Sequence, residues 1–161
     1  MSEKQVIVYQ GKEGIACVVN PAPTYSGTME ELLKDTVPDD CKDSADIVDV
    51  DTLPMDKDGN VCRVFRNAWD TEKGKSAEVN LTKAKEMAKD NVRKARTPKF
   101  AELDVAYLLA DEAGDADAKA AVVVKKQTAR DATADTKITN ADSVDNLKTG
   151  MNEVITEVGD L

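Results

Sequence analysis

Residues 81–118 read LTKAKEMAKDNVRKARTPKFAELDVAYLLADEAGDADA, and this stretch changes the sign of its charge halfway along. The first half, 81–99, carries seven Lys or Arg against two acids, whereas the second half, 100–118, carries six acids and no base. Apolar residues recur at positions 81, 84, 88, 92 and 95, which is the spacing of an amphipathic helix. The stretch therefore predicts a helical arm whose charge blocks meet a partner or each other.

Pro98 lies at the point where the charge changes sign. A proline at the first position of a helix is favourable, whereas one inside a helix costs about 3 kcal/mol. We therefore expect a break, with one helix starting at Leu81 and a second over about 98–113. If the two helices fold back on each other, the basic and acidic blocks face each other. A single kinked helix is the alternative.

Two glycines mark further helix ends in the C-terminal half. Gly114 is a natural residue to follow a helix, and Asp115 is a natural cap for a third helix over about 116–130. A last short helix over about 141–149 is expected to end at Gly150. The sequence then predicts a domain of residues 79–150 broken at Pro98 and Gly114, followed by a tail, 151–161, that is a strand, a short helix or a partner-bound segment.

The N-terminal half follows a different period. Short runs rich in β-branched residues alternate with turn residues, and this pattern is typical of strands. Thr28 and Glu31 fit a capping box at the start of one short helix. The expected strands cover 5–10, 14–19, 46–52 and 61–69, and the helix covers 28–36. The fold class is therefore α+β, with a small β-rich domain over residues 1–78 followed by an arm of three to four helices.

Composition narrows the classes of function. The 161 residues carry a net charge of −9, which argues against general nucleic-acid binding because such binding needs a clustered basic face. Three cysteines at wide spacing and the absence of histidine argue against a disulfide framework and a zinc site. No apolar stretch predicts a signal peptide or a membrane span. We expect synthesis and folding in the cytoplasm.

No motif in the chain predicts catalysis, a metal or a cofactor. Gly74-Lys75-Ser76 resembles the end of a phosphate-binding loop, but Trp69 stands where that loop needs glycine. The run 56–60 (DKDGN) resembles part of a calcium loop, but Pro54 and Phe65 occupy positions that need oxygen ligands. With no histidine to activate a nucleophile, we expect a protein that is not an enzyme.

Candidate partner-binding residues are the single tryptophan and the basic and aromatic side chains of the arm. Trp69 fits either a core position or an interface anchor, because tryptophan is enriched at binding hot spots. The basic run fits an acidic protein surface or the acidic helix of this same chain. If it binds a partner, neutralising its charges should weaken association in a salt-sensitive way. The candidates are Trp69, Lys89, Arg93, Arg96, Phe100 and Tyr107.

Several segments together resemble a group of small proteins encoded among the tail and tail-fibre genes of tailed bacteriophages. The shared order is a Phe-Arg-x-Ala-Trp segment, a helical arm with basic residues and a proline before Leu-Asp, a Gly-Asp helix start and an Arg-Asp loop. These elements correspond here to 65–69, 83–104, 114–119 and 130–131. The likeness covers about residues 5–148 and leaves 149–161 outside.

This resemblance implies a virion structural protein of the tail, made in the host cytoplasm. Its expected role is that of a small adaptor or peripheral component that docks a fibre or baseplate part. The implied partners are other tail or fibre proteins, and a homo-oligomer is a further option. A tail-fibre assembly chaperone and a capsid decoration protein are the alternative functions.

Overall fold

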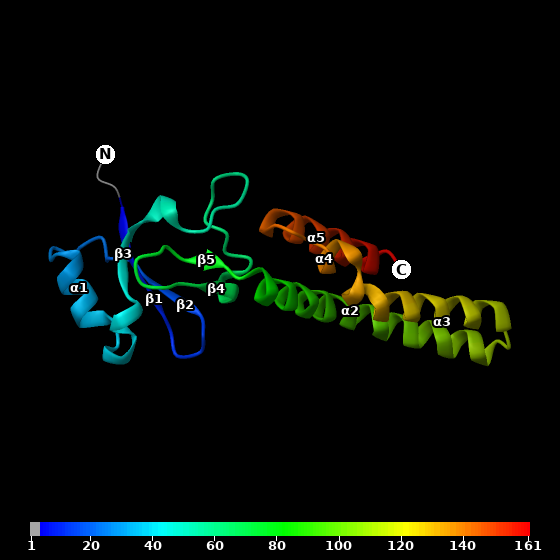
Figure 1. Cartoon of the computed structure of the whole chain (residues 1–161). Coiled ribbons are helices and arrows are strands. Elements are labelled where there is room, and N and C mark those ends of the chain that lie inside the picture. Colours follow the sequence, from blue (N-terminus) through cyan, green and yellow to red (C-terminus); the bar gives the residue numbers. More distant parts are fainter. Residues whose placement is uncertain (1–3) are drawn as a thin grey trace. The chain divides into compact units, whose positions relative to one another are not determined.

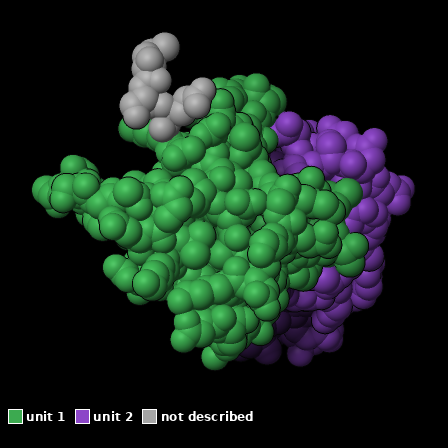
Figure 2. Space-filling view, turned by 60° about the vertical axis from the view of Figure 1, so that its left-hand side comes forward, with its two compact units in different colours: residues 1–84 green, residues 85–161 purple. Residues whose placement is uncertain are grey.

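The structure is a computed structural model that describes residues 4–161 (Figure 1). It divides into two compact units, one ending at Ala84 and one starting at Lys85, which Figure 2 distinguishes by colour. The first unit, here called the sheet unit, holds a small three-stranded sheet, and the second, the helical unit, is built from helices. The predicted α+β class, with strands first and helices second, is confirmed.

The sheet has the strand order β2-β1-β3, and both pairings are antiparallel. The strands are β1 (Gln5–Gln10), β2 (Ala16–Val19) and β3 (Asp46–Asp49). Ile7 of the central strand pairs with Val19 on one side and with Ile47 on the other. Gly14, with φ of 71°, supplies the left-handed residue in the turn between β1 and β2. The predicted hairpin is thus confirmed.

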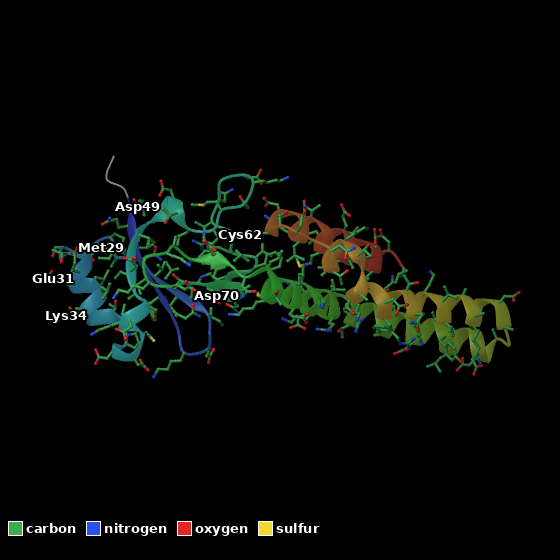
Figure 3. All side chains as sticks on the ribbon, viewed as in Figure 1. Met29, Glu31, Lys34, Asp49, Cys62 and Asp70 are labelled. Atoms are coloured by element: carbon green, nitrogen blue, oxygen red, sulfur yellow. The ribbon has the colours of Figure 1, made fainter. Side chains whose placement is uncertain are left out.

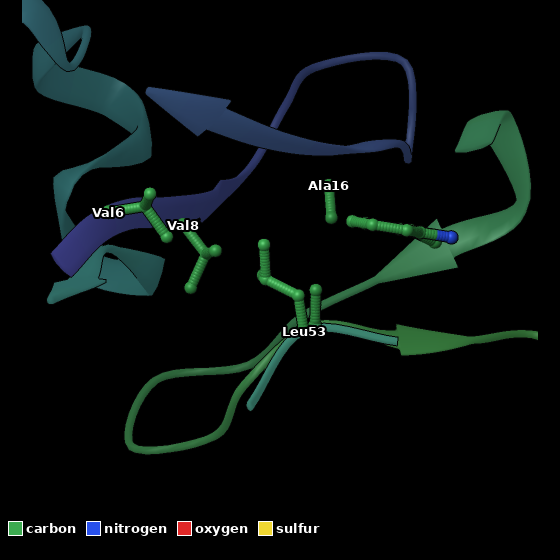
Figure 4. Packing of buried hydrophobic residues seen from close by; sticks show 6 residues of the cluster. Val6, Val8, Ala16 and Leu53 are labelled. Carbon is green, nitrogen blue, oxygen red and sulfur yellow. The ribbon is translucent and has the colours of Figure 1, made fainter. Parts of the chain in front are cut away.

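Alternation along β1 divides the sheet unit into two cores. Val6 and Val8 face a cluster that includes Ala16, Leu53 and Trp69. Figure 4 labels the side chains of this cluster that come from β1, from β2 and from Leu53. Ile7 faces the opposite cluster, which contains Leu32, Val37, Cys41 and Ala45. A strand with buried residues on both faces explains why β1 reads as a continuous apolar run.

Helix α1 (Met29–Thr36) covers the Ile7 face of the sheet. The predicted capping box is present: Glu31 N–H donates to Thr28 Oγ1 at 3.2 Å, and Thr28 N–H donates to Glu31 Oε2 at 2.9 Å. Figure 3 labels Met29, Glu31 and Lys34 on this helix. Met29 packs against the cluster, so one face of α1 is buried while its acidic first turn stays in solvent.

The strand predicted over 61–69 is wrong. Val61 forms one isolated bridge with Met55, residues Arg66–Ala68 form a 3₁₀ turn, and only β4 (Trp69–Asp70) is extended, paired with β5 (Glu78–Val79). Before Trp69, the buried residues of this segment are Cys62, Phe65 and Ala68, which recur every three positions. That period suits turns of 3₁₀ type, whereas a strand needs a period of two.

The helices after the sheet are α2 (Leu81–Glu112), which belongs to the helical unit from Lys85 onward, α3 (Ala116–Asp131), α4 (Thr136–Thr139) and α5 (Val144–Gly159). The predicted break at Pro98 is wrong, because α2 is one continuous helix of 32 residues. Val92 before the proline and Leu103 after it are both buried, and this packing on both sides offsets the cost of the proline. Proline has no N–H to donate to the carbonyl of Lys94, four residues earlier. Both Lys94 and Pro98 are exposed to solvent.

The predicted helix end at Gly150 is also wrong. Helix α5 continues to Gly159, so most of the expected tail 151–161 is helical, with Met151, Val154 and Val158 buried. Gly150 is itself buried, and a Cβ there would lie 2.9 Å from the carbonyl carbon of Lys137 in α4. This glycine allows close approach of two helices and does not end one. Gly114, with φ of 66°, does end α2 as expected.

Candidate partner-binding surfaces

The C-terminal half of α2 and the antiparallel α3 form a hairpin, the α2–α3 hairpin (residues 100–131) (Figure 1). Leu103 and Ala110 are buried on the inner side of α2, and Ala129 is buried on α3. Lys126 Nζ lies 2.8 Å from Asp104 Oδ1, and a second ion pair joins Lys119 to Asp111 nearer the turn. The acidic half of α2 thus pairs with the basic residues of α3.

Tyr107 lies within this hairpin. Its ring lies under two ammonium groups, 5.1 Å from Lys119 Nζ and 4.7 Å from Lys126 Nζ. Hydrogen bonds raise the pKa of Lys119 above its ordinary value. The bond to Asp111 contributes most, and the bond to Tyr107 comes second. The ring stabilises the two lysines by cation–π contact, so Tyr107 holds the hairpin together.

Phe100 and Arg96 have a similar role at the other end of the hairpin. Arg96 Nη1 donates to the carbonyl oxygens of Ala129 at 3.0 Å and of Arg130 at 2.9 Å. These carbonyls belong to the last turn of α3, where a cation satisfies free acceptors and the helix dipole. The Phe100 ring lies 5.7 Å from Arg96 Cζ and 5.8 Å from Arg130 Cζ.

Lys89 and Arg93 are paired within their own helix. Lys89 Nζ lies 2.6 Å from Glu86 Oε1, and Arg93 pairs with Asp90, each partner being three residues earlier. Exposed pairs of this kind contribute about 0.2–0.5 kcal/mol to a helix. Their charges are balanced by these neighbours, so the predicted basic block attracts an acidic partner less strongly than its sequence indicates.

Trp69 belongs to the core of the sheet unit. Its side chain is 1% exposed, and the Arg66 guanidinium lies 4.5 Å from the centre of its ring. Of the two interpretations of this residue, the burial favours the core position. Trp69 lies in the sheet unit, where the sequence placed it, whereas the other five candidates lie in the helical unit.

A surface that sequence reasoning missed lies on the outside of the α2–α3 hairpin. Five large apolar side chains are exposed there, by 49% to 65%, on the sides of α2 and α3 that face away from each other. We call them the outer apolar patch: Val105, Leu108, Leu109, Val123 and Val124.

The sequence contains a signal for this patch. Val105, Leu108 and Leu109 are spaced by three and four residues, as a second apolar stripe requires, on the side of α2 away from the stripe of Leu103 and Ala110 that faces α3. Three consecutive valines, 122–124, lie in α3. Successive residues of a helix point in directions about 100° apart, so the three cannot all face α2.

Comparison with protein-family models, with curated proteins and with solved structures found no match to this chain. Within residues 4–161, none of the helices has the length and apolar character that crossing a bilayer requires. The same described residues contain no cluster of three or more acidic or cysteine side chains placed to hold a metal ion.

Proposed function

We propose that this protein is a non-enzymatic structural component of a bacteriophage tail. In this role it is a small adaptor or peripheral protein that docks a fibre or baseplate part through the α2–α3 hairpin. The phage context comes from the resemblance of residues 5–148 to small tail-associated proteins. The docking role is supported by one observation, the α2 side of the outer apolar patch, where Val105, Leu108 and Leu109 are exposed together, because exposed apolar surface on a soluble protein commonly marks an interaction site.

Covering the patch contributes part of the free energy of association. Complete burial of a valine or leucine side chain is worth about 1.5–3 kcal/mol. Each of the five side chains is about half exposed, so covering one contributes about 1 kcal/mol, and covering the three on α2 contributes roughly 3 kcal/mol. That is an upper estimate of one component, since association also costs rotational and translational freedom.

Charge around the patch indicates the kind of partner. Glu112 and Asp117 flank the hairpin turn, and neither has an ion pair among the described residues. We therefore propose an occupant that is another tail protein with an apolar helix or sheet face edged by lysine or arginine. A second copy of this chain carries the same acids beside its own patch, and so it offers them no complementary charge there.

The test uses phage particles assembled with variants of this protein. Leu108→Gln combined with Leu109→Gln keeps helix-forming side chains and should leave folding within about 0.5 kcal/mol of wild type, since both residues are exposed. Mass spectrometry of purified particles should then find the variant strongly depleted. Lys89→Gln combined with Arg93→Gln, two substitutions on the same helix outside the patch, is the matched control and should be incorporated normally.

Four results would contradict the proposal. Normal incorporation of the Leu108/Leu109 variant would show that the patch does not dock the protein. Absence of the wild-type protein from purified particles would favour the tail-fibre assembly chaperone. Hundreds of copies per particle would favour a capsid decoration protein, since a tail component is expected in a few to a dozen copies. A larger, salt-sensitive loss in the Lys89/Arg93 control would assign docking to the basic block instead.

A further inference from the structure

The sheet unit contains a pocket of about 340 Å³ whose lining is basic and apolar. Its apolar walls come from β2, from the segment after β3 and from the loop that leads to β4. No lining residue is acidic, although residues 1–80 contain sixteen acids and only nine bases. The lining residues are Val18, Asn20, Val50, Leu53, Val61, Arg63, Arg66 and Trp69.

Two of these residues hold buried donors without an acceptor. Arg66 Nη1 and Trp69 Nε1 are enclosed, and neither makes a hydrogen bond within the described residues. Trp69 as a whole is 1% exposed. Burial lowers the pKa of Arg66 because it disfavours the charged form. Arg63 also has no ion pair within residues 4–161, so two guanidinium groups line the pocket without a counter-charge.

Contacts among the described residues stabilise the Arg66 guanidinium but leave the hydrogen-bond donors of Arg66 and Trp69 unpaired. Arg66 lies over the Trp69 ring at 4.5 Å, and this cation–π contact stabilises the guanidinium. The contact uses the face of the indole, whereas the Nε1–H donor lies in the plane of the ring. It therefore leaves the indole donor unpaired. Buried donors are nearly always paired, and what both donors lack is an acceptor.

The chemistry of the walls selects the acceptor. Guanidinium and indole N–H groups are donors only, so the ligand must be an acceptor, and a carboxylate matches the fork of an arginine. Val18, Val50 and Leu53 add apolar surface beside the donors. The ligand therefore combines a carboxylate with a branched aliphatic group a few bonds away. A C-terminal valine, isoleucine or leucine has this combination, whereas an aspartate or glutamate side chain lacks it.

We propose that this pocket binds the C-terminal carboxylate of a partner polypeptide that ends in an aliphatic residue. Arg66 and Arg63 hold the carboxylate, Trp69 Nε1 and the Asn20 amide donate to its oxygens, and the terminal side chain packs against the valines and Leu53. The volume, near the lower end for ligand pockets, suits one terminal residue. This proposal is independent of the tail function and of the outer apolar patch.

The single tryptophan makes the test direct, because the chain has one indole N–H signal in a ¹⁵N-edited NMR spectrum. N-acetyl-leucine serves as the probe, and N-acetyl-leucinamide, which lacks the charge, serves as its control. The acid should shift the indole signal in a saturable way, and the amide should not. Arg66→Gln and Arg63→Gln should each weaken binding about tenfold. Arg93→Gln, which removes the same charge in the helical unit, should leave it unchanged.

Several outcomes would overturn the proposal. These are no shift with N-acetyl-leucine, an equal shift with the amide, or equal weakening by Arg93→Gln. A further titration uses inorganic phosphate at matched ionic strength. If phosphate binds as tightly as N-acetyl-leucine, the pocket is a general anion site and the proposal is wrong. If Arg66→Gln does not fold, Arg63→Gln decides the question, because Arg63 is exposed and its replacement removes no buried contact.

Discussion

Replacing Gly150 by alanine tests how closely α4 and α5 pack. The added Cβ would lie 2.9 Å from the carbonyl carbon of Lys137, 3.0 Å from its Cβ, and closer still to its carbonyl oxygen. Ordinary van der Waals contact begins at 3.4 Å, so the α4 backbone must move by about 0.5 Å or more. A flexible side chain cannot relieve this clash, because the obstructing atoms belong to a backbone.

Two opposing effects set how much Gly150→Ala changes the free energy of unfolding. Overpacking of a well-packed site costs about 1–3 kcal/mol, and the upper end applies here because the neighbour is backbone. Alanine in place of glycine inside a helix returns up to about 1 kcal/mol. We therefore expect Gly150→Ala to lower the free energy of unfolding by about 1–2 kcal/mol.

Gly159→Ala is the matched control. It makes the same change in the same helix, but no atom lies within 4 Å of the added Cβ. Its free energy of unfolding should equal or slightly exceed that of the wild type.

Urea denaturation followed by far-UV circular dichroism measures this effect, because most helical residues lie beyond Lys85. Fluorescence of Trp69 reports separately on the sheet unit. If Gly150→Ala is as stable as Gly159→Ala, the close approach of α5 to Lys137 is wrong, and the helix pair is looser than described.

Two further predictions concern the sheet unit. Trp69→Ala should lower the free energy of unfolding by about 3–5 kcal/mol, since the ring is 1% exposed; a loss below about 1 kcal/mol in urea denaturation would contradict its core position. Burial by itself would raise the pKa of Asp70, but hydrogen bonds from Lys83 and Asn80 outweigh it and lower the pKa below its ordinary value of 3.8. The stability that Asp70 contributes is therefore present above about pH 4 and is lost as the pH falls through the lowered pKa. Asp70→Asn should be less stable than wild type at neutral pH, by under about 1 kcal/mol because the pair is partly exposed, and the difference should vanish in acid; a constant difference across the titration would exclude this ion pair as its cause.

Features decided by neighbouring residues were predictable from the sequence. The capping box at Thr28, the hairpin of β1 and β2, and the end of α2 at Gly114 each depend on residues within a few positions of one another. Local hydrogen bonds and backbone preferences determine these features, so the pattern alone was enough. Figure 3 labels Asp70, which accepts hydrogen bonds from the Asn80 and Lys83 side chains; these partners lie 10 and 13 residues away, and the sequence did not predict them.

Features decided by distant packing were not predictable in this way. Pro98 and Gly150 both carry strong local signals to end a helix, and both lie inside one. The burial of Val92 and Leu103 keeps α2 continuous, and the approach of α4 gives Gly150 a packing role. The Arg66–Trp69 pocket was missed for the same reason, since its walls come from segments more than forty residues apart.

The continuity of α2 changes the meaning of its charge reversal. On one continuous helix the basic and acidic halves cannot fold onto each other, so the acidic half needs other cations. Helix α3 supplies them, because Lys119 and Lys126 pair with Asp111 and Asp104.

At the point of reversal, Lys99 Nζ lies 3.2 Å from Glu102, and earlier in the helix Lys89 and Arg93 pair with their own neighbours. The reversal is thus largely neutralised within the helical unit, where it specifies the antiparallel packing of α2 and α3. Apart from Glu112 and Asp117 at the hairpin turn, which have no ion pair among the described residues, a block neutralised in this way has little charge left to attract a partner. The free energy for docking must then come from uncharged surface, and on this hairpin that surface is the outer apolar patch.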